Sequence, residues 1–112
     1  MIEVVLLDYL NNSNLSAQVY MERPKDRPDY YFILEKSGSG KVNQIEESDF
    51  IVQSYAPTLY EAARMNEEIK AVIFNAITLN EISAVELNTD YNYTNAESKS
   101  YRYQAVYVIT HY

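Results

Sequence analysis

The chain closes with Tyr101-Arg-Tyr-Gln-Ala-Val-Tyr-Val-Ile-Thr-His-Tyr112, a run dominated by aromatic and β-branched residues. Such residues are enriched in strands, so we expect a strand over residues 100–111. The run holds four tyrosines and the only histidine of the chain. We expect a chain that stops on a strand to present a surface suited to packing or docking, and nothing in this run indicates catalysis.

The segments before this strand predict one long helix and a further strand. Residues 91–99 are polar and turn-rich, and residues 82–90 predict a strand. Upstream, Thr58-x-x-Glu61 has the spacing of a capping box and follows Pro57, which is typical of a helix start. The apolar stripe of this helix consists of Leu59, Ala62, Ala63, Ile69, Val72, Ile73, Ala76 and Ile77.

The N-terminal half predicts a short helix followed by strands. Apolar residues from Ile2 to Leu10 recur at helical spacing, and residues 11–14 contain asparagines that suit a helix C-cap. A short strand is expected at residues 19–21, an extended connector between Pro24 and Pro28, and a strand covered on both faces at residues 30–35. A return strand is expected over residues 43–55, with its buried part at residues 50–52.

Both glycines of the chain lie in one segment, which we interpret as a flexible hairpin tip. It reads Lys36, Ser37, Gly38, Ser39, Gly40, Lys41. The expected element order is then α-β-β-β-α-β-β. This order predicts a single α+β domain, a two-layer sandwich with a mainly antiparallel sheet of four or five strands, one long helix and a short N-terminal helix.

Composition limits the classes of function. The 112 residues suffice for one domain, and there is no cysteine for disulfides or thiolate chemistry. Net charge is −7 and the basic residues are scattered, so we expect no sequence-specific nucleic-acid binding. The N-terminus lacks the basic region of a signal peptide, and no apolar run is long enough to span a membrane. We therefore expect a soluble protein that is intracellular when made.

Three candidate chemical sites are weak in the sequence. The glycine segment lacks the first glycine of a Walker A loop and the hydroxyl residue after its lysine. Glu46 and Glu47 are adjacent on an expected strand, where neighbouring side chains point to opposite faces and do not share an ion easily. His111 is expected to have a packing or hydrogen-bonding role, since no Ser/His/Asp set is apparent. We expect no enzyme, cofactor or metal site.

Tyrosine is the overrepresented residue, with 12 of 112 positions. Tyr31, Tyr103 and Tyr107 are expected to fill strand positions. Tyr91, Tyr93 and Tyr112 lie in an expected loop or at the terminus, and for them an intersubunit role and ordinary strand packing are equally consistent with the sequence. Tyrosine suits surfaces that are wet before docking and buried afterwards.

Several segments together resemble a known family. They are the amphipathic opening helix, the Pro24-x-x-x-Pro28 connector before Tyr-Phe-Ile-Leu-Glu35, the Gly-Ser-Gly segment, Phe50-Ile-Val-Gln-Ser-Tyr-Ala56 before Leu-Tyr-Glu-Ala-Ala63, and the Tyr-Arg-Tyr-Gln-Ala-Val-Tyr ending. The chain is similar over nearly its whole length to tail terminator or head–tail joining proteins of siphophages that infect Gram-positive bacteria. The similarity lies in the order of the expected elements and in the local sequences of these segments, because that family has no catalytic signature.

The resemblance implies a virion structural protein of the tail or neck, made in the host cytoplasm. Such proteins form a hexameric ring on the last ring of the tail tube, stop tube polymerisation and contact the head–tail connector protein. The expected partners are other copies of the chain, the major tail tube protein and the connector, and the free protein can be a monomer in solution. The predicted interface residues are Lys36, Ser37, Gly38, Ser39, Gly40, Lys41, Tyr91, Tyr93 and Tyr112.

The expected mechanism is ordering on contact: the segment 36–41 or the loop 91–99 orders against tube protein or a neighbouring subunit. Two other functions fit the sequence. One is another neck or head-completion protein, for which more basic loops would be expected. The other is a small ligand-binding α+β domain, for which a pocket with converging polar groups would be expected.

Overall fold

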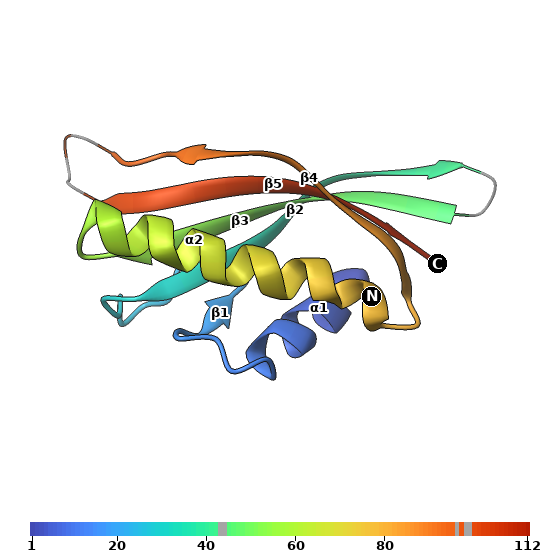
Figure 1. Cartoon of the computed structure of the whole chain (residues 1–112), viewed down its shortest axis with the longest axis horizontal. Coiled ribbons are helices and arrows are strands. Elements are labelled where there is room, and N and C mark those ends of the chain that lie inside the picture. The colour runs from blue at the N-terminus through green and yellow to red at the C-terminus, as the bar shows by residue number, and fades with distance from the viewer. Residues whose placement is uncertain (43–44, 96, 98–99) are drawn as a thin grey trace.

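Two helices lie on one face of a five-stranded sheet in the computed structural model, which describes residues 1–42, 45–95, 97 and 100–112 (Figure 1). The elements follow one another as α1 Ile2–Asn11, β1 Val19–Tyr20, β2 Tyr31–Val42, β3 Ile45–Ala56, α2 Leu59–Phe74, the 3-10 helix η1 Asn75–Thr78, β4 Ile82–Asn92 and β5 Tyr101–His111. The predicted α+β two-layer fold and its element order are confirmed.

The sheet has the strand order β1-β2-β3-β5-β4. The short β1 runs parallel to β2, and the other neighbouring strands are antiparallel. The sheet is therefore mainly antiparallel, as predicted. Strand β5 lies between β3 and β4, so the C-terminal run occupies an interior position and both of its edges are hydrogen-bonded.

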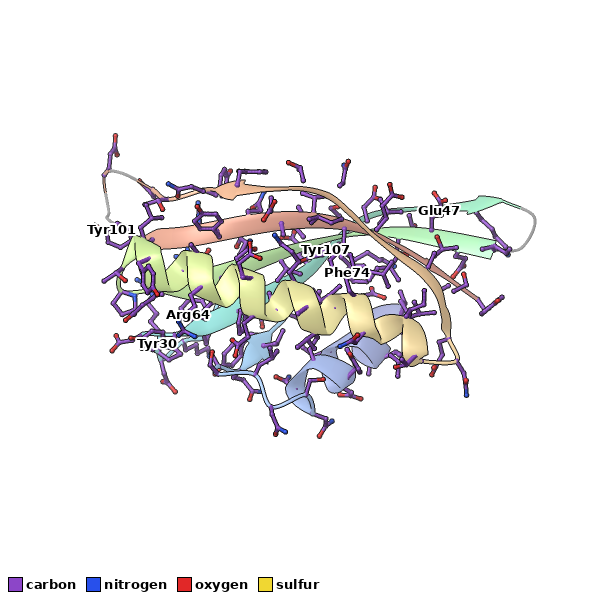
Figure 2. The ribbon with its side chains drawn as sticks, viewed as in Figure 1. Tyr30, Glu47, Arg64, Phe74, Tyr101 and Tyr107 are labelled. Carbon is purple, nitrogen blue, oxygen red and sulfur yellow. The ribbon has the colours of Figure 1, made fainter. Side chains whose placement is uncertain are left out.

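The core lies between the helices and the sheet. Leu6 and Leu10 of α1 and Ile69 of α2 are fully buried against Phe50 and Tyr107 of the sheet. Figure 2 labels Tyr107 in this layer between β5 and α2. Along β3 the even-numbered residues face the helices and the odd-numbered residues face away, because successive side chains alternate on a strand.

Helix α2 begins as the capping motif predicts: Thr58 Oγ1 accepts a hydrogen bond of 3.2 Å from the Glu61 backbone N–H. Its predicted stripe is correct at the buried Ala62, Ile69, Ile73 and Ala76. It is wrong at two positions, since Leu59 is 39% exposed and Ile77 is 50% exposed. Leu59 starts the helix and Ile77 lies in η1, where the change from α to 3-10 geometry shifts the apolar face.

The predicted hairpin tip at residues 36–41 is wrong. These residues belong to β2 and pair with β3, with Gly38 opposite Asp49 and Gly40 opposite Glu47. Neither glycine has a positive φ, because cross-strand pairing holds the backbone extended whether or not the side chain is present. Strand β2 continues to Val42 and β3 begins at Ile45, and the predicted start of the return strand at Asn43 lies outside the described residues.

The predicted loop at residues 91–99 begins later than expected. Strand β4 continues to Asn92, so Tyr91 is a strand residue paired with Gln104. Tyr93 follows the strand, and its backbone N–H still bonds to the Arg102 carbonyl at 2.9 Å. The strand propensity of Tyr91 outweighs that of its polar neighbours Asp90 and Asn92. Residues 96 and 98–99 of this segment lie outside the described residues.

Candidate functional site

The predicted interface residues separate into two groups at opposite ends of the sheet. Lys36, Ser39, Gly40, Lys41 and Tyr112 line one cleft of about 470 Å³ with the first turn of α1. Tyr91 and Tyr93 lie at the other end, beside Arg102. Ser37 sits at a bulge of β2 and donates to the Asp49 carbonyl at 3.3 Å, and Gly38 faces away from the helices. The fold therefore offers two candidate sites.

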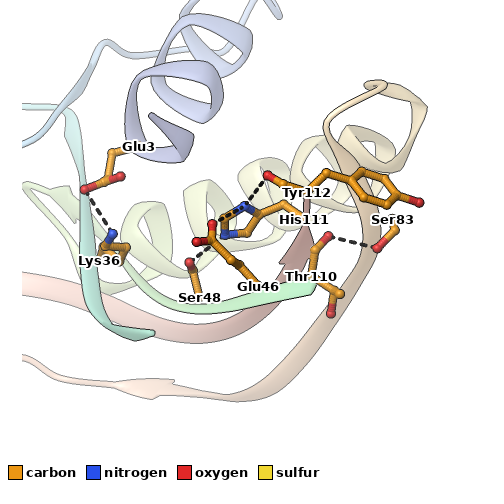
Figure 3. A network of polar contacts seen from close by, with 8 residues as sticks. All are labelled: Glu3, Lys36, Glu46, Ser48, Ser83, Thr110, His111 and Tyr112. Atoms are coloured by element: carbon orange, nitrogen blue, oxygen red, sulfur yellow. Dashed lines mark hydrogen bonds and ion pairs between the residues drawn. The ribbon is translucent and has the colours of Figure 1, made fainter. Parts of the chain in front are cut away.

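The cleft lies where α1 meets β2, β3 and the end of β5 (Figure 3). Lys36 Nζ forms an ion pair of 3.4 Å with Glu3 Oε2, which joins β2 to α1. Hydrogen bonding to backbone N–H and to Lys36 lowers the pKa of Glu3, against a smaller opposing effect of burial. Lysine, glutamate and backbone groups thus line the same hollow, with Tyr112 73% exposed at its rim.

The cleft contains a Ser–His–Glu arrangement that the sequence did not predict. His111 Nε2 and Ser48 Oγ are 2.7 Å apart, and His111 Nδ1 lies 3.6 Å from Glu46 Oε2 (Figure 3). Glu46 and Ser48 are two residues apart on β3 and so share a face, while His111 on β5 is the cross-strand partner of Glu46. Only the register of β3 and β5 brings these three residues together.

The geometry favours packing over nucleophilic catalysis for this trio. Ser48 is 1% exposed and His111 is 4% exposed, so a substrate carbonyl has little access to the hydroxyl. Ser48 also pairs with Ser39 on one neighbouring strand and with Ile109 on the other. Because its backbone takes part in the sheet, the backbone N–H of Ser48 is not free to stabilise an oxyanion. The predicted packing and hydrogen-bonding role of His111 is confirmed.

The acidic cluster of β3 divides between the two faces, as strand alternation predicts. Glu46 points into the cleft, whereas Glu47 and Asp49 point to the open face, which is the face of the sheet away from the helices. Within the described residues, no group of three or more His, Asp or Glu side chains has the proximity of a metal site.

The second candidate site is a row of tyrosines and arginines across the open face. Tyr31 of β2 and Tyr55 of β3 stack with ring centroids 4.5 Å apart and planes 9° apart. Arg102 of β5 donates from Nη1 to the Tyr55 hydroxyl at 2.8 Å, and its guanidinium lies 4.6 Å from the Tyr93 ring centroid. Arg23 lies 5.7 Å from the Tyr55 centroid. We call these five residues the Tyr–Arg row.

Hydrogen bonds hold the Tyr–Arg row and its neighbours in place. Arg102 Nε donates to the Tyr93 carbonyl at 2.7 Å. Gln104 donates to the Tyr91 hydroxyl at 2.6 Å and accepts from Gln53 at 2.8 Å. Among the described residues, no carboxylate lies within 4 Å of Arg23 or Arg102, and both guanidinium groups contact tyrosines of the row instead.

Sequence reasoning found only part of this row. Tyr93 was predicted as an interface residue and Tyr31 as a strand-filling residue, and Tyr31 is indeed 6% exposed. Tyr55, Arg23 and Arg102 were missed. Tyr55 lies five positions after the buried Phe50, and an odd separation along a strand predicts that the two side chains point to opposite faces, so Tyr55 could have been placed away from the core. Its pairing with Arg102 could not have been predicted in this way, because that pairing depends on the register between two strands that are distant in sequence.

No protein-family model matches the chain, and no curated protein matches its sequence. Within the described part of the chain, the helices are too short or too polar to cross a membrane.

Proposed function

We propose that this protein is a tail-completion protein of a long-tailed phage. It caps the tail tube as a hexameric ring, ends tube polymerisation and joins the tail to the head connector. The proposal rests on the resemblance of the sequence to that family, and the α+β two-layer fold is the one that the resemblance implies.

The observation that carries a ring-forming function is that the sheet has two open edges. Among the described residues, β4 has a strand partner on one side only, and β1 covers β2 only at Phe32 and Ile33. Because the strands from β2 to β4 alternate in direction, β4 of one copy can pair antiparallel with the outer part of β2 in the next copy. Such head-to-tail contacts close into rings when the rotation between copies permits it.

The edge strand β4 also limits unwanted pairing. Its register with β5 shifts between Ile82 and Ala84 and again between Leu87 and Thr89. Bulges of this kind twist an edge and make it a poor template for indiscriminate strand addition. A ring would therefore form on a matching surface, such as the end of a tail tube, more readily than in dilute solution.

The test is disruption of this gene in the genome that encodes it, followed by electron microscopy of the lysate. We expect overlong or unjoined tails beside DNA-filled heads, and normal particles when the intact gene is supplied in trans. Normal infectious particles without the gene would overturn the proposal. Heads that lose their DNA, with tails of normal length, would indicate another neck or head-completion protein instead.

A second function, binding of a small polar ligand, is favoured by the cleft. Its volume of about 470 Å³ lies within the range of ligand pockets, and Lys36, Glu46 and His111 converge on it. A thermal-shift screen of small metabolites separates the two functions. A ligand that stabilises the wild type but not a Lys41→Met variant would support this second function.

A further inference from the structure

We propose that three arginines at the end of the sheet where β5 begins bind a phosphate group. They are Arg23, Arg27 and Arg102, and they lie around the stacked rings of Tyr31 and Tyr55. We call these three residues the arginine cluster. The inference does not depend on the proposed function, because the ring uses sheet edges whereas this site is formed by the side chains of one chain.

The arginine cluster concentrates positive charge in an acidic protein. It holds three of the four arginines of a chain whose net charge is −7. The guanidinium carbons of Arg23 and Arg102 each lie 5.7 Å from the centre of the Tyr55 ring, so the two charges are close neighbours. Among the described residues, no carboxylate lies within 4 Å of any of the three arginines. Like charges at this separation repel each other, and a bound anion would offset the repulsion.

The third arginine, Arg27, acts on the same pair of rings. It lines a pocket of about 200 Å³ together with Tyr31 and Tyr55. Burial and the neighbouring Tyr55 raise the pKa of Tyr31, whereas the charges of all three arginines lower it. Each guanidinium group therefore lies close enough to the Tyr31 hydroxyl to influence its ionisation.

The pocket suits a small polar group. It lies where β2 and β5 begin and β3 ends, and Ser100 and Tyr101 add hydroxyl-bearing side chains to its wall (Figure 2 labels Tyr101). Pockets for drug-sized ligands measure about 300–1,000 Å³, so this one fits a smaller occupant. Tyr31 is 6% exposed beneath Tyr20, and Tyr55 is 4% exposed. Stacking of a ligand on these rings is thus excluded, and the polar groups around them form the site.

The backbone of Arg27 is strained in a way that favours a role for its side chain. Its φ is 44°, which side chains other than glycine and asparagine rarely adopt. Pro28 follows it, and a residue before proline favours extended backbone. Glycine would fit this position with less strain. Because strained residues cluster at binding sites, we infer that the guanidinium group is the reason for an arginine here.

The chemistry of the cluster selects phosphate. Arg102 donates to the Tyr93 carbonyl at 2.7 Å and to the Tyr55 hydroxyl at 2.8 Å, and these bonds use two of its five N–H groups. A guanidinium group binds two oxygens of one oxyanion as a planar fork. Three such groups match the several oxygens and the double charge of phosphate better than they match a single carboxylate. Asp29 also lines the pocket, and its carboxylate opposes anion binding.

Thermal unfolding in increasing inorganic phosphate, with sodium chloride holding the ionic strength constant, tests the site. We expect a saturable rise in the melting temperature of the wild type. Arg27→Asn should bind phosphate at least about tenfold more weakly. In chloride alone it should melt at the same temperature as the wild type or higher, because asparagine tolerates a positive φ. Lys25→Asn is the matched control: it removes the same charge from the same connector but lines a separate pocket against α1, so its affinity should stay within about twofold of the wild type.

Two further variants keep the test informative if Arg27→Asn fails to fold. Arg102→Lys keeps the charge but loses the fork, and it should weaken phosphate binding. Asp29→Asn should strengthen it. Phenyl phosphate distinguishes the sources of the group: tighter binding than inorganic phosphate would assign the site to a phosphate ester, and equal binding to free phosphate. A wild type without a saturable phosphate effect, an Arg27→Asn or Arg102→Lys variant that binds like the wild type, or a Lys25→Asn variant as weak as Arg27→Asn would each overturn the proposal.

Discussion

Asn66 on α2 and Asp90 on β4 are joined by a hydrogen bond of 2.9 Å from the Asn66 amide to Asp90 Oδ2. Lys70 Nζ lies 2.7 Å from the same oxygen and 2.9 Å from Glu67 Oε1. Among the described strands β4 pairs with β5 alone, and this cluster adds a polar link to the helix layer beside the core packing of Val85 and Leu87. It gives the side-chain nitrogen of Asn66, which is 1% exposed on the core side of α2, a hydrogen-bond acceptor.

The Asp90–Lys70 pair makes stability depend on pH. Hydrogen bonding from Lys70 lowers the pKa of Asp90 below its usual 3.8, and hydrogen bonding to Asp90 raises the pKa of Lys70 above 10.5. A carboxyl with a lowered folded pKa stabilises the fold above its unfolded pKa, and this contribution is lost as pH falls through the folded value. The lysine contribution is present below its unfolded pKa and is lost as pH rises through the raised folded value.

Asp90→Asn should therefore cost about 1 kcal/mol at neutral pH and much less in acid. Urea denaturation of variant and wild type at about pH 7 and about pH 3 measures the difference. Glu67→Gln is the control, because Glu67 is 69% exposed and should change stability by no more than about 0.5 kcal/mol. Equal destabilisation by Asp90→Asn at both pH values would show that the charge is not responsible.

The hydroxyl of Tyr107 is buried and has no hydrogen-bond partner among the described residues. Burial raises the pKa of Tyr107 well above its usual value, with a smaller effect from Asp90. Replacing Tyr107 with phenylalanine creates only a small cavity and removes the cost of burying a hydroxyl that has no hydrogen bond. Tyr107→Phe should therefore leave the free energy of unfolding unchanged or raise it by up to about 1 kcal/mol.

Tyr9 provides the comparison, since its hydroxyl donates to the Val72 carbonyl at 2.7 Å. Tyr9→Phe should lower stability by about 1 kcal/mol. Thermal unfolding of both variants under one set of conditions measures the contrast. A Tyr107→Phe variant that loses as much stability as Tyr9→Phe would indicate that an ordered water satisfies the Tyr107 hydroxyl.

Local features could be predicted from the sequence because a few neighbouring residues determine them. Thr58 and Glu61 identify the start of α2 by themselves, and the periodic apolar residues of α1 predict its buried face. The glycines misled the prediction at residues 36–41, because glycine permits a turn without requiring one. The strand there depends on β3, which no local pattern in residues 36–41 reveals.

The candidate sites depended on long-range register and so could be predicted only in part. Ser48 and His111 are 63 positions apart, and Tyr55 and Arg102 are 47 apart. A shift of β5 by one residue relative to β3 would turn His111 and Arg102 to the opposite face and separate both pairs. The sequence therefore predicted Lys36, Lys41 and Tyr93 as interface residues, but it did not identify the residues that lie beside them in the fold.

The cap of α2 gives a third prediction. Thr58→Ala should lower stability by about 1 kcal/mol, because the Glu61 N–H loses its acceptor at the helix N-terminus. Thr58→Ser keeps a hydroxyl at that position and should stay close to the wild type. Chemical denaturation followed by far-ultraviolet circular dichroism measures both. If serine and alanine destabilise equally, the methyl group of Thr58 and not its hydroxyl stabilises the helix start.

The hydrogen bond between Ser48 and His111 gives the last prediction. Ser48→Ala leaves His111 Nε2 without its partner at 2.7 Å in a site that is 4% exposed, and a buried polar atom left unpaired costs about 1–3 kcal/mol. Ser83→Ala is the matched control: the Ser83 hydroxyl donates to the Thr110 carbonyl at 3.3 Å on the exposed edge, so its loss should cost less than about 0.5 kcal/mol. Urea denaturation of the two variants separates these values. Equal stability of Ser48→Ala and Ser83→Ala would mean that cleft water replaces the lost hydroxyl, and the cleft would then be wetter and more accessible at His111 than its burial indicates.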